Sequence, residues 1–140
     1  MKIKRVNRYY CDFCKKAGCS KWHMARHEKH CTMNPNRICR YCKIMEVEQQ
    51  KMDELLALLT KPEMVKNEYG VYYKPIIDIE SEIEALRDIT SNCPMCMFSA
   101  IRQKGIPIYM TSFDLKSEME SFWSEYNISR IDIPSSQGNI

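Results

Sequence analysis

The stretch CDFCKKAGCSKWHMARHEKHC, from Cys11 to Cys31, decides the fold of the N-terminal part of this chain. Its 21 residues hold four cysteines and three histidines, the side chains that bind zinc in most structural sites. Four of them follow the spacing Cys11-x2-Cys14-x12-His27-x3-Cys31. A CxxC turn presents two thiolates, and two side chains four residues apart on a helix complete a tetrahedron around the metal. The spacing predicts a zinc site at these four residues.

Three other side chains in the stretch fit a metal site less well. His30 follows His27 by only three residues, and His23 would leave a loop of eight residues after Cys14. Cys19 lies in the turn before the expected helix and has no partner at a diagnostic spacing. We therefore exclude Cys19 and His23 as ligands and keep His30 as the alternative.

Residues 9–31 resemble a ββα zinc finger in its Cys-Cys-His-Cys variant. Tyr9 stands two residues before the first cysteine and Met24 three before the histidine, where that family keeps core residues. The family's usual aromatic, four residues after the second cysteine, is Gly18 here, so the small core is thinner. The resemblance implies a helix that begins near Lys21. The family's base-contacting positions fall on Ser20, His23 and Arg26.

A second set of cysteines forms two more CxxC pairs, Cys39-x2-Cys42 and, fifty residues later, Cys93-x2-Cys96. Two such pairs brought together make a four-thiolate zinc site, and Pro94 suits the turn between two ligands. The long insertion exceeds the spacing of a short zinc ribbon. Redox-active CxxC pairs and a site shared by two chains remain alternatives, although the βαβ pattern of a thioredoxin-like motif is missing.

Length and composition limit the kind of protein that this chain can be. The chain has 140 residues, 44% of them hydrophobic, enough for one ordinary domain. It contains no apolar run long enough to span a bilayer, and MKIKRVNRYYC lacks the apolar region of a secretory signal. We expect a cytoplasmic protein with no membrane partner. A reducing compartment keeps thiols free, so its eight cysteines favour two bound zinc ions over disulfides.

Apolar periodicity and turn residues predict the remaining elements. Pro62 limits the first helix after the second CxxC pair, and Ser81 with Glu84 reads as a capping box. Gly105 suits the left-handed cap that ends another helix. Helices are expected at 44–59, 78–90, 97–104 and 113–126, and short strands at 69–74 and 106–110.

The last of these helices has an aromatic face that we expect to lie in the core: Leu115, Met119, Phe122, Trp123 and Tyr126. The predicted fold is α+β, mostly α, a small zinc-stabilised protein. It comprises a basic zinc-finger head at 1–36, a helical body at 37–126 held together by the four-cysteine zinc site, and a flexible tail at 127–140.

Charge is distributed unevenly along the chain. Residues 1–43 carry twelve lysines and arginines against two acidic residues, a balance of +10. The remainder carries nine basic and sixteen acidic residues, a balance of −7. Such a division predicts two surfaces with different partners, or one surface that offsets the other electrostatically.

The basic head favours nucleic acid, DNA or RNA, as the partner. Cations neutralise phosphates, and the interleaved aromatic residues Tyr9, Tyr10, Trp22 and Tyr41 can stack on bases. A lone finger reads about 3 bp, so sequence-specific recognition would need a second element or a dimer. The expected contact residues are Lys15, Lys16, Lys21, Arg26, Lys29, Arg37 and Arg40.

A protein-binding adaptor or inhibitor is the alternative, because the acidic body has methionine-rich and aromatic faces. Residues 27–42 and 93–105 resemble small zinc-binding proteins of tailed bacteriophages. That resemblance implies a phage origin and a bacterial cytoplasm, with no activity attached.

We expect no enzyme and no small-molecule substrate. Glu28 follows His27, but an HExxH motif would need a histidine at position 31, which is Cys31. The sequence NCPMC at 92–96 is similar to part of a deaminase signature, but no H-x-E motif precedes it. Two sites filled by four protein ligands each leave no open coordination position for catalysis.

Overall fold

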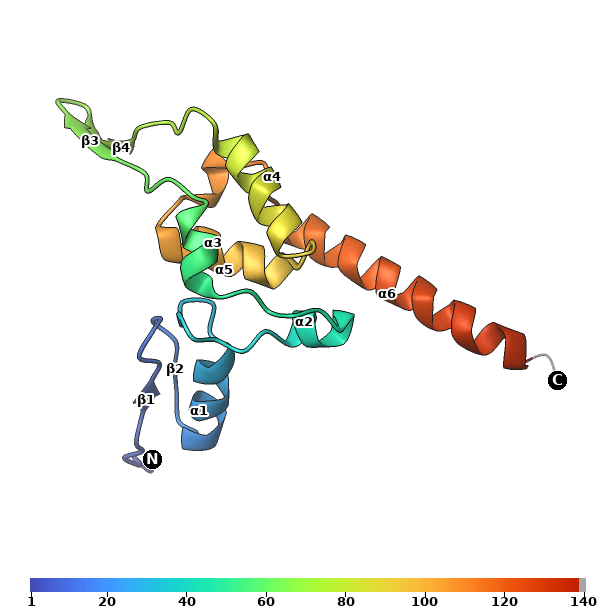
Figure 1. Ribbon diagram of the computed structural model, residues 1–140. Helices are drawn as coiled ribbons and strands as arrows, with labels where there is room; N and C mark the ends of the chain where they lie inside the picture. The colour runs from blue at the N-terminus through green and yellow to red at the C-terminus, as the bar shows by residue number, and fades with distance from the viewer. Residues whose placement is uncertain (139–140) are drawn as a thin grey trace.

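The computed structural model describes the backbone of residues 1–138 and the side chains of residues 1–128. The chain is a small α+β protein in which helices predominate, as predicted, and both sheets are two-stranded (Figure 1). The elements in order are β1 (Tyr9–Tyr10), β2 (Ala17–Gly18), α1 (Lys21–His30), α2 (Arg40–Met45), α3 (Met52–Ala57), β3 (Met64–Asn67), β4 (Gly70–Tyr73), α4 (Ile79–Ile89), α5 (Pro94–Lys104), the 3-10 helix η1 (Ile108–Met110) and α6 (Leu115–Gly138).

The N-terminal unit, residues 9–31, is a short hairpin packed against α1. Strands β1 and β2 pair antiparallel with Tyr9 opposite Gly18, and α1 contacts both. The helix begins at Lys21, as predicted, because the Ser20 hydroxyl accepts the backbone N–H of His23 at 3.3 Å. Met24 is buried between this helix and the hairpin, where Tyr9 also packs. With so few apolar groups, this unit needs another source of stability.

Helix α5 is the centre of the helical body. It packs against α3, α4 and α6, and Met97, Ala100 and Ile101 are completely buried at i, i+3 and i+4 spacing (Figure 1). Pro94 occupies the first turn, where its missing N–H costs nothing. Gly105 ends the helix with φ at +79°, as predicted.

Helix α4 begins earlier than its predicted capping box. Its first residue is Ile79, so Ser81 lies inside the first turn and does not cap it. Ile83 and Leu86 are buried in the core. After the helix, Ser91 and Asn92 both have positive φ, and this tight reversal leads directly into the third CxxC pair.

The helix predicted over 44–59 is wrong in one respect: the segment forms two helices, α2 and α3. Glu46 adopts φ of +58° and ends α2. The Gln49 side chain then bonds back to the start of the segment, accepting Cys39 N–H and donating to the Arg37 carbonyl, both at 2.6 Å. Residues 47–51, which include Gln49, lie outside both helices.

The predicted strand at 69–74 is confirmed as β4, which pairs with β3 in a hairpin that projects from the body (Figure 1). The predicted strand at 106–110 is wrong, because its last residues form η1. Pro107 and Ile108 accept backbone hydrogen bonds from Met110 and Thr111, which closes a 3-10 turn. Ile106 is still buried against the core.

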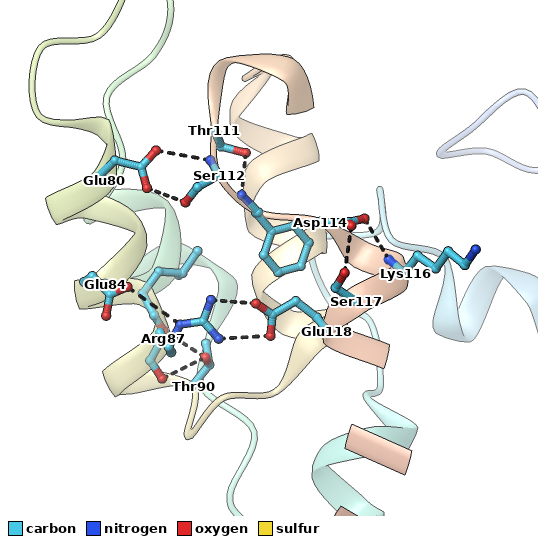
Figure 2. Close-up of polar contacts among 12 residues, drawn as sticks. Glu80, Glu84, Arg87, Thr90, Thr111, Ser112, Asp114, Lys116, Ser117 and Glu118 are labelled. Carbon is cyan, nitrogen blue, oxygen red and sulfur yellow. Dashed lines mark hydrogen bonds and ion pairs between the residues drawn. The ribbon is translucent and has the colours of Figure 1, made fainter. Parts of the chain in front are cut away.

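Polar contacts attach the start of α6 to α4 (Figure 2). The Arg87 guanidinium donates to both oxygens of Glu118, at 2.7 and 2.9 Å, and the backbone N–H and hydroxyl of Ser112 donate to Glu80. Asp114 accepts the Lys116 N–H and caps the first turn. A bidentate arginine–carboxylate pair fixes both distance and angle, so the direction of α6 is set here.

Helix α6 continues past Tyr126 to Gly138 and extends away from the body (Figure 1). The tail predicted at 127–140 therefore has helical backbone as far as Gly138, and its side chains beyond residue 128 lie outside the described residues. Of the face predicted to be core, Phe122 is buried, but Trp123 is 38% exposed. Within the described chain, no helix combines the length and apolar character needed to cross a membrane.

The left-handed residue that ends α2 offers a test of the fold. Glu46 is exposed and holds φ of +58°, a conformation that costs a non-glycine residue about 1 kcal/mol. We expect Glu46→Gly to raise the free energy of unfolding by about 1 kcal/mol in guanidinium denaturation. Glu48→Gly removes the same charge two residues away, where φ is not positive, and should lower the free energy. Equal destabilisation by both would contradict the observed break.

Candidate metal centres

Four predicted ligands meet in the N-terminal metal centre, formed by Cys11, Cys14, His27 and Cys31. Their ligand atoms all lie within 4.8 Å of one another, and Cys14 Sγ is 3.3 Å from His27 Nε2. The hairpin supplies the first two, because Cys11 N–H bonds the Lys16 carbonyl and closes the CxxC turn. Helix α1 supplies His27 and, just after its end, Cys31. This arrangement could hold a four-coordinate metal ion.

Hydrogen bonds and burial prepare these side chains for metal binding. Burial raises the pKa of the Cys14 thiol, but hydrogen bonds from the Lys16 N–H and from neighbouring thiols outweigh it, and the net pKa is lowered. Burial also lowers the pKa of His27, and the nearby charge of Lys16 lowers it further. His27 is therefore neutral at pH 7 and keeps a lone pair for the metal. Burial raises the pKa of Cys31 to about 11, so a metal bound here would have to displace the proton of this thiol.

The residues excluded or held in reserve lie outside this group. Cys19 and His23 are exposed and are not among the clustered ligand atoms. His30 points away from the group, because its Nδ1 is 2.8 Å from the Ile38 carbonyl oxygen. Its role in the structure is to fix the segment that follows α1.

The four-cysteine centre consists of Cys39, Cys42, Cys93 and Cys96. The first pair lies at the start of α2 and the second at the start of α5, and all four are at most 3% exposed. Cys39 Sγ lies 3.4 Å from Cys93 Sγ, and Cys42 Sγ the same distance from Cys96 Sγ. Four sulfurs bound to one zinc would be about 3.8 Å apart, given Zn–S bonds of about 2.3 Å. The four sulfurs lie within 4.8 Å of one another, so the group fits a tetrahedral ion.

This geometry bears on the alternatives left open by the sequence. All four cysteines come from one chain, so a second chain is not needed to complete the group. The sulfur contacts of 3.4 Å run between the two CxxC pairs, from Cys39 to Cys93 and from Cys42 to Cys96. All eight cysteines of the chain are free thiols. The arrangement favours a shared metal over a separate redox reaction at each pair.

Charge at the four-cysteine centre is partly balanced by Arg37. Hydrogen bonds from Cys42, Cys93 and Cys96 hold the pKa of Cys39 well below its usual range, while donation to Cys39 raises the pKa of Cys42. Four thiolates around a divalent ion carry two net negative charges. The Arg37 guanidinium, only 5% exposed, donates from Nη1 to Cys96 Sγ at 3.7 Å and offsets part of this charge.

The structure corrects the prediction that Arg37 contacts nucleic acid, because its guanidinium faces the sulfurs and not solvent. Its position two residues before a CxxC pair was the available signal for this role. The other six predicted contacts are exposed: Lys15, Lys16, Lys21, Arg26, Lys29 and Arg40.

The segment joining the two centres is held by α5. Gln103 donates from Nε2 to the carbonyls of Thr32 and Asn34, at 2.8 and 3.1 Å, and Arg102 donates to the Thr32 hydroxyl at 2.6 Å. Asn34 in turn donates to the Glu28 carbonyl near the end of α1. The same helix that supplies Cys96 therefore fixes the N-terminal unit, a connection that sequence reasoning missed. Polar residues on a helix give no indication of which distant carbonyl they bind.

No protein-family model, curated protein or solved structure matches this chain. The resemblances stated for residues 9–31, 27–42 and 93–105 therefore depend on the short motifs themselves. The two groups of clustered ligands remain the firmest observation about function.

Single cysteine substitutions test the assignment of ligands. We expect Cys31→Ser and Cys93→Ser each to remove one metal equivalent per chain, measured by native mass spectrometry, because each breaks one group of four and leaves the other complete. Cys19→Ser is the matched control and should retain both equivalents, since Cys19 is exposed and outside both groups. If Cys31→Ser retained both metal equivalents, the fourth ligand of the N-terminal centre would be His30 and not Cys31.

The two centres should differ in their exchange with a chelator. Cys14 and His27 are partly exposed, whereas all four thiols of the other centre are buried. A chelator reaches a metal through exposed ligands, so we expect two-phase release in which the N-terminal centre empties first. Cys31→Ser should abolish the fast phase in a colorimetric competition assay. If Cys31→Ser lost the slow phase instead, the N-terminal centre would be the one that releases its metal slowly.

Proposed function

We propose that each centre holds a structural zinc ion. Thiolate and imidazole ligands suit zinc, and its structural sites typically combine three cysteines with one histidine or use four cysteines. The clustering of four protein ligands in each group supports this role, because a catalytic zinc keeps one position for water or substrate. On this proposal the protein binds a partner and does not catalyse a reaction.

The proposed partner is nucleic acid, bound by the basic face of the N-terminal unit and α2. The observation that carries this proposal is the exposure of the six remaining cations, none of which forms an ion pair within residues 1–128. Glu28, one of the two acidic residues of this region, is engaged elsewhere, because its carboxylate accepts the Asp12 backbone N–H at 2.8 Å. Unpaired lysines and arginines on one face produce a positive field that attracts phosphates.

Protein binding is the second candidate, and the β3–β4 hairpin favours it. Met64 and Tyr69 are 60% and 89% exposed on an element that projects from the body (Figure 1). An isolated two-stranded hairpin has little stability in water, so its apolar side chains would gain from a partner. Binding through this element would depend only weakly on salt.

Salt dependence of binding tests the proposed function. We expect the affinity for a labelled oligonucleotide, measured by fluorescence anisotropy, to fall steeply with salt. Lys21→Gln with Lys29→Gln removes two cations from α1 and should reduce the log–log slope by up to about 1.8 on a duplex. Lys66→Gln with Lys74→Gln makes the same change in charge near the β3–β4 hairpin and should leave the slope unchanged. Equal effects of the two double variants, or no salt dependence, would contradict the proposal.

A further inference from the structure

A groove of about 390 Å³ lies where α1, α2, α5 and α6 meet. Ile38, Ile44 and Met95 supply apolar walls, and Tyr41 and Trp123 supply aromatic rings. The remaining lining side chains are His30, Arg37 and Arg40, so no acidic residue contributes to it. An apolar hollow with cationic groups beside it suits a ligand that is flat, apolar and attached to negative charge.

The aromatic rings in the groove are held in place by their neighbours. The Tyr41 ring lies 5.1 Å from Phe122 and 6.0 Å from Trp123, both edge to face, and the Trp123 ring lies 5.6 Å from Tyr126. Trp123 remains 38% exposed and Ile38 53% exposed despite these contacts. A fixed, exposed indole presents apolar surface that folding has not buried, and ring contacts have already restricted its motion.

A second exposed tryptophan leads toward this groove along α1. Trp22, Arg26 and His30 stand at i, i+4 and i+8, on one face of the helix. Trp22 is 64% exposed, and the Arg26 guanidinium carbon lies 5.5 Å from the centre of its ring. His30, at the end of the helix, lines the groove. One face of α1 therefore carries Trp22 and Arg26 and ends with His30 at the groove that Trp123 also lines.

We propose that this track binds single-stranded nucleic acid, with one base in the groove on Trp123 and another on Trp22. Arg26 and Arg40 would contact the phosphates beside these bases. This inference rests on the proposed function and names its substrate class. In a duplex the base faces are covered by their neighbours, so only an unpaired strand can place a base in the groove.

None of the acidic side chains of α6 within the described residues lines the groove. Glu118 is paired with Arg87, Glu125 lines a separate hollow beside that arginine, and Glu120 is exposed outside the groove lining. Arg26 lies over the Trp22 ring, and Arg40 lines the same groove as Trp123, which matches the combination of stacking and charge in single-strand-binding proteins. An acidic peptide would need only one apolar anchor, and its charge would not account for the exposure of Trp22.

The chain has only two tryptophans, so each can serve as its own reporter. Trp22→Phe leaves Trp123, and Trp123→Phe leaves Trp22, as the sole source of indole fluorescence. We expect short single-stranded oligothymidylate to quench both variants, because stacking on a base quenches the indole. A matching duplex should leave Trp123 emission unchanged. An abasic strand of equal length, which carries phosphates without bases, should quench neither.

Affinity gives the second measurement. Trp123→Leu should weaken binding of oligothymidylate roughly five- to 150-fold, the range for loss of one base–aromatic stack, and leave duplex affinity unchanged. Tyr109→Leu is the matched control: Tyr109 is 79% exposed, lies outside the groove lining and should have no effect. Ile38→Ala tests the opposite wall without touching α6 and should weaken the same binding. Circular dichroism and metal content identify any variant that fails to fold.

The outcomes separate this inference from the function on which it depends. No binding of either strand form would contradict the proposed function itself. Binding of both forms with unchanged Trp123 emission would retain the function and overturn the single-strand track. Quenching of Trp123 by polyglutamate but not by oligothymidylate would show that the groove takes an acidic peptide. This result would also overturn the single-strand track.

Discussion

The contact among four cysteine sulfurs is the constraint on which the helical body depends. It brings the start of α2 against the start of α5 across fifty intervening residues, and it buries all four thiols. A metal bound there would close a long loop, and closing it removes more entropy from the unfolded chain than closing a short one. Helices α3 and α4 lie inside that loop, and α5, which begins at the closing pair, completes the core with them. Arg37 supports the same sulfur contact, because its positive charge balances negative charge on the sulfurs that would otherwise be unpaired.

The position of the N-terminal unit follows from the four-cysteine centre. Cys96 and Gln103 lie on one helix, α5, and Gln103 binds the segment that leaves Cys31. Anything that moves the start of α5 therefore moves the N-terminal unit as well. For the proposed nucleic-acid track this matters, since its two tryptophans lie on α1 and α6, which are linked through α5 and the segment that α5 holds. A weakened four-cysteine centre would change the spacing between those rings without touching either one.

Sequence reasoning located the ligands because metal spacing is a local property. Two residues between cysteines, and three between His27 and Cys31, fix turn and helix geometry before any tertiary contact forms. It was wrong where a distant partner decided the outcome. Gln49 interrupts the predicted helix through hydrogen bonds to Arg37 and Cys39, and nothing in the apolar periodicity of 44–59 encodes them. Trp123 was assigned to the core by its spacing, yet it packs only partly, against Tyr41 and Tyr126, and stays 38% exposed.

The division of charge acquires a physical meaning once the fold is known. A net charge of +3 would attract nucleic acid only weakly if it were spread evenly over the surface. Here the excess of positive residues lies within residues 1–43, and the track that they border has no acidic residue in its groove. The acidic remainder pairs internally where it can, as Glu118 does with Arg87, and would repel phosphates from the rest of the surface. On the proposed function, attraction at one face and repulsion elsewhere would restrict a bound strand to a single path, so the two halves of the charge distribution would act together to select it.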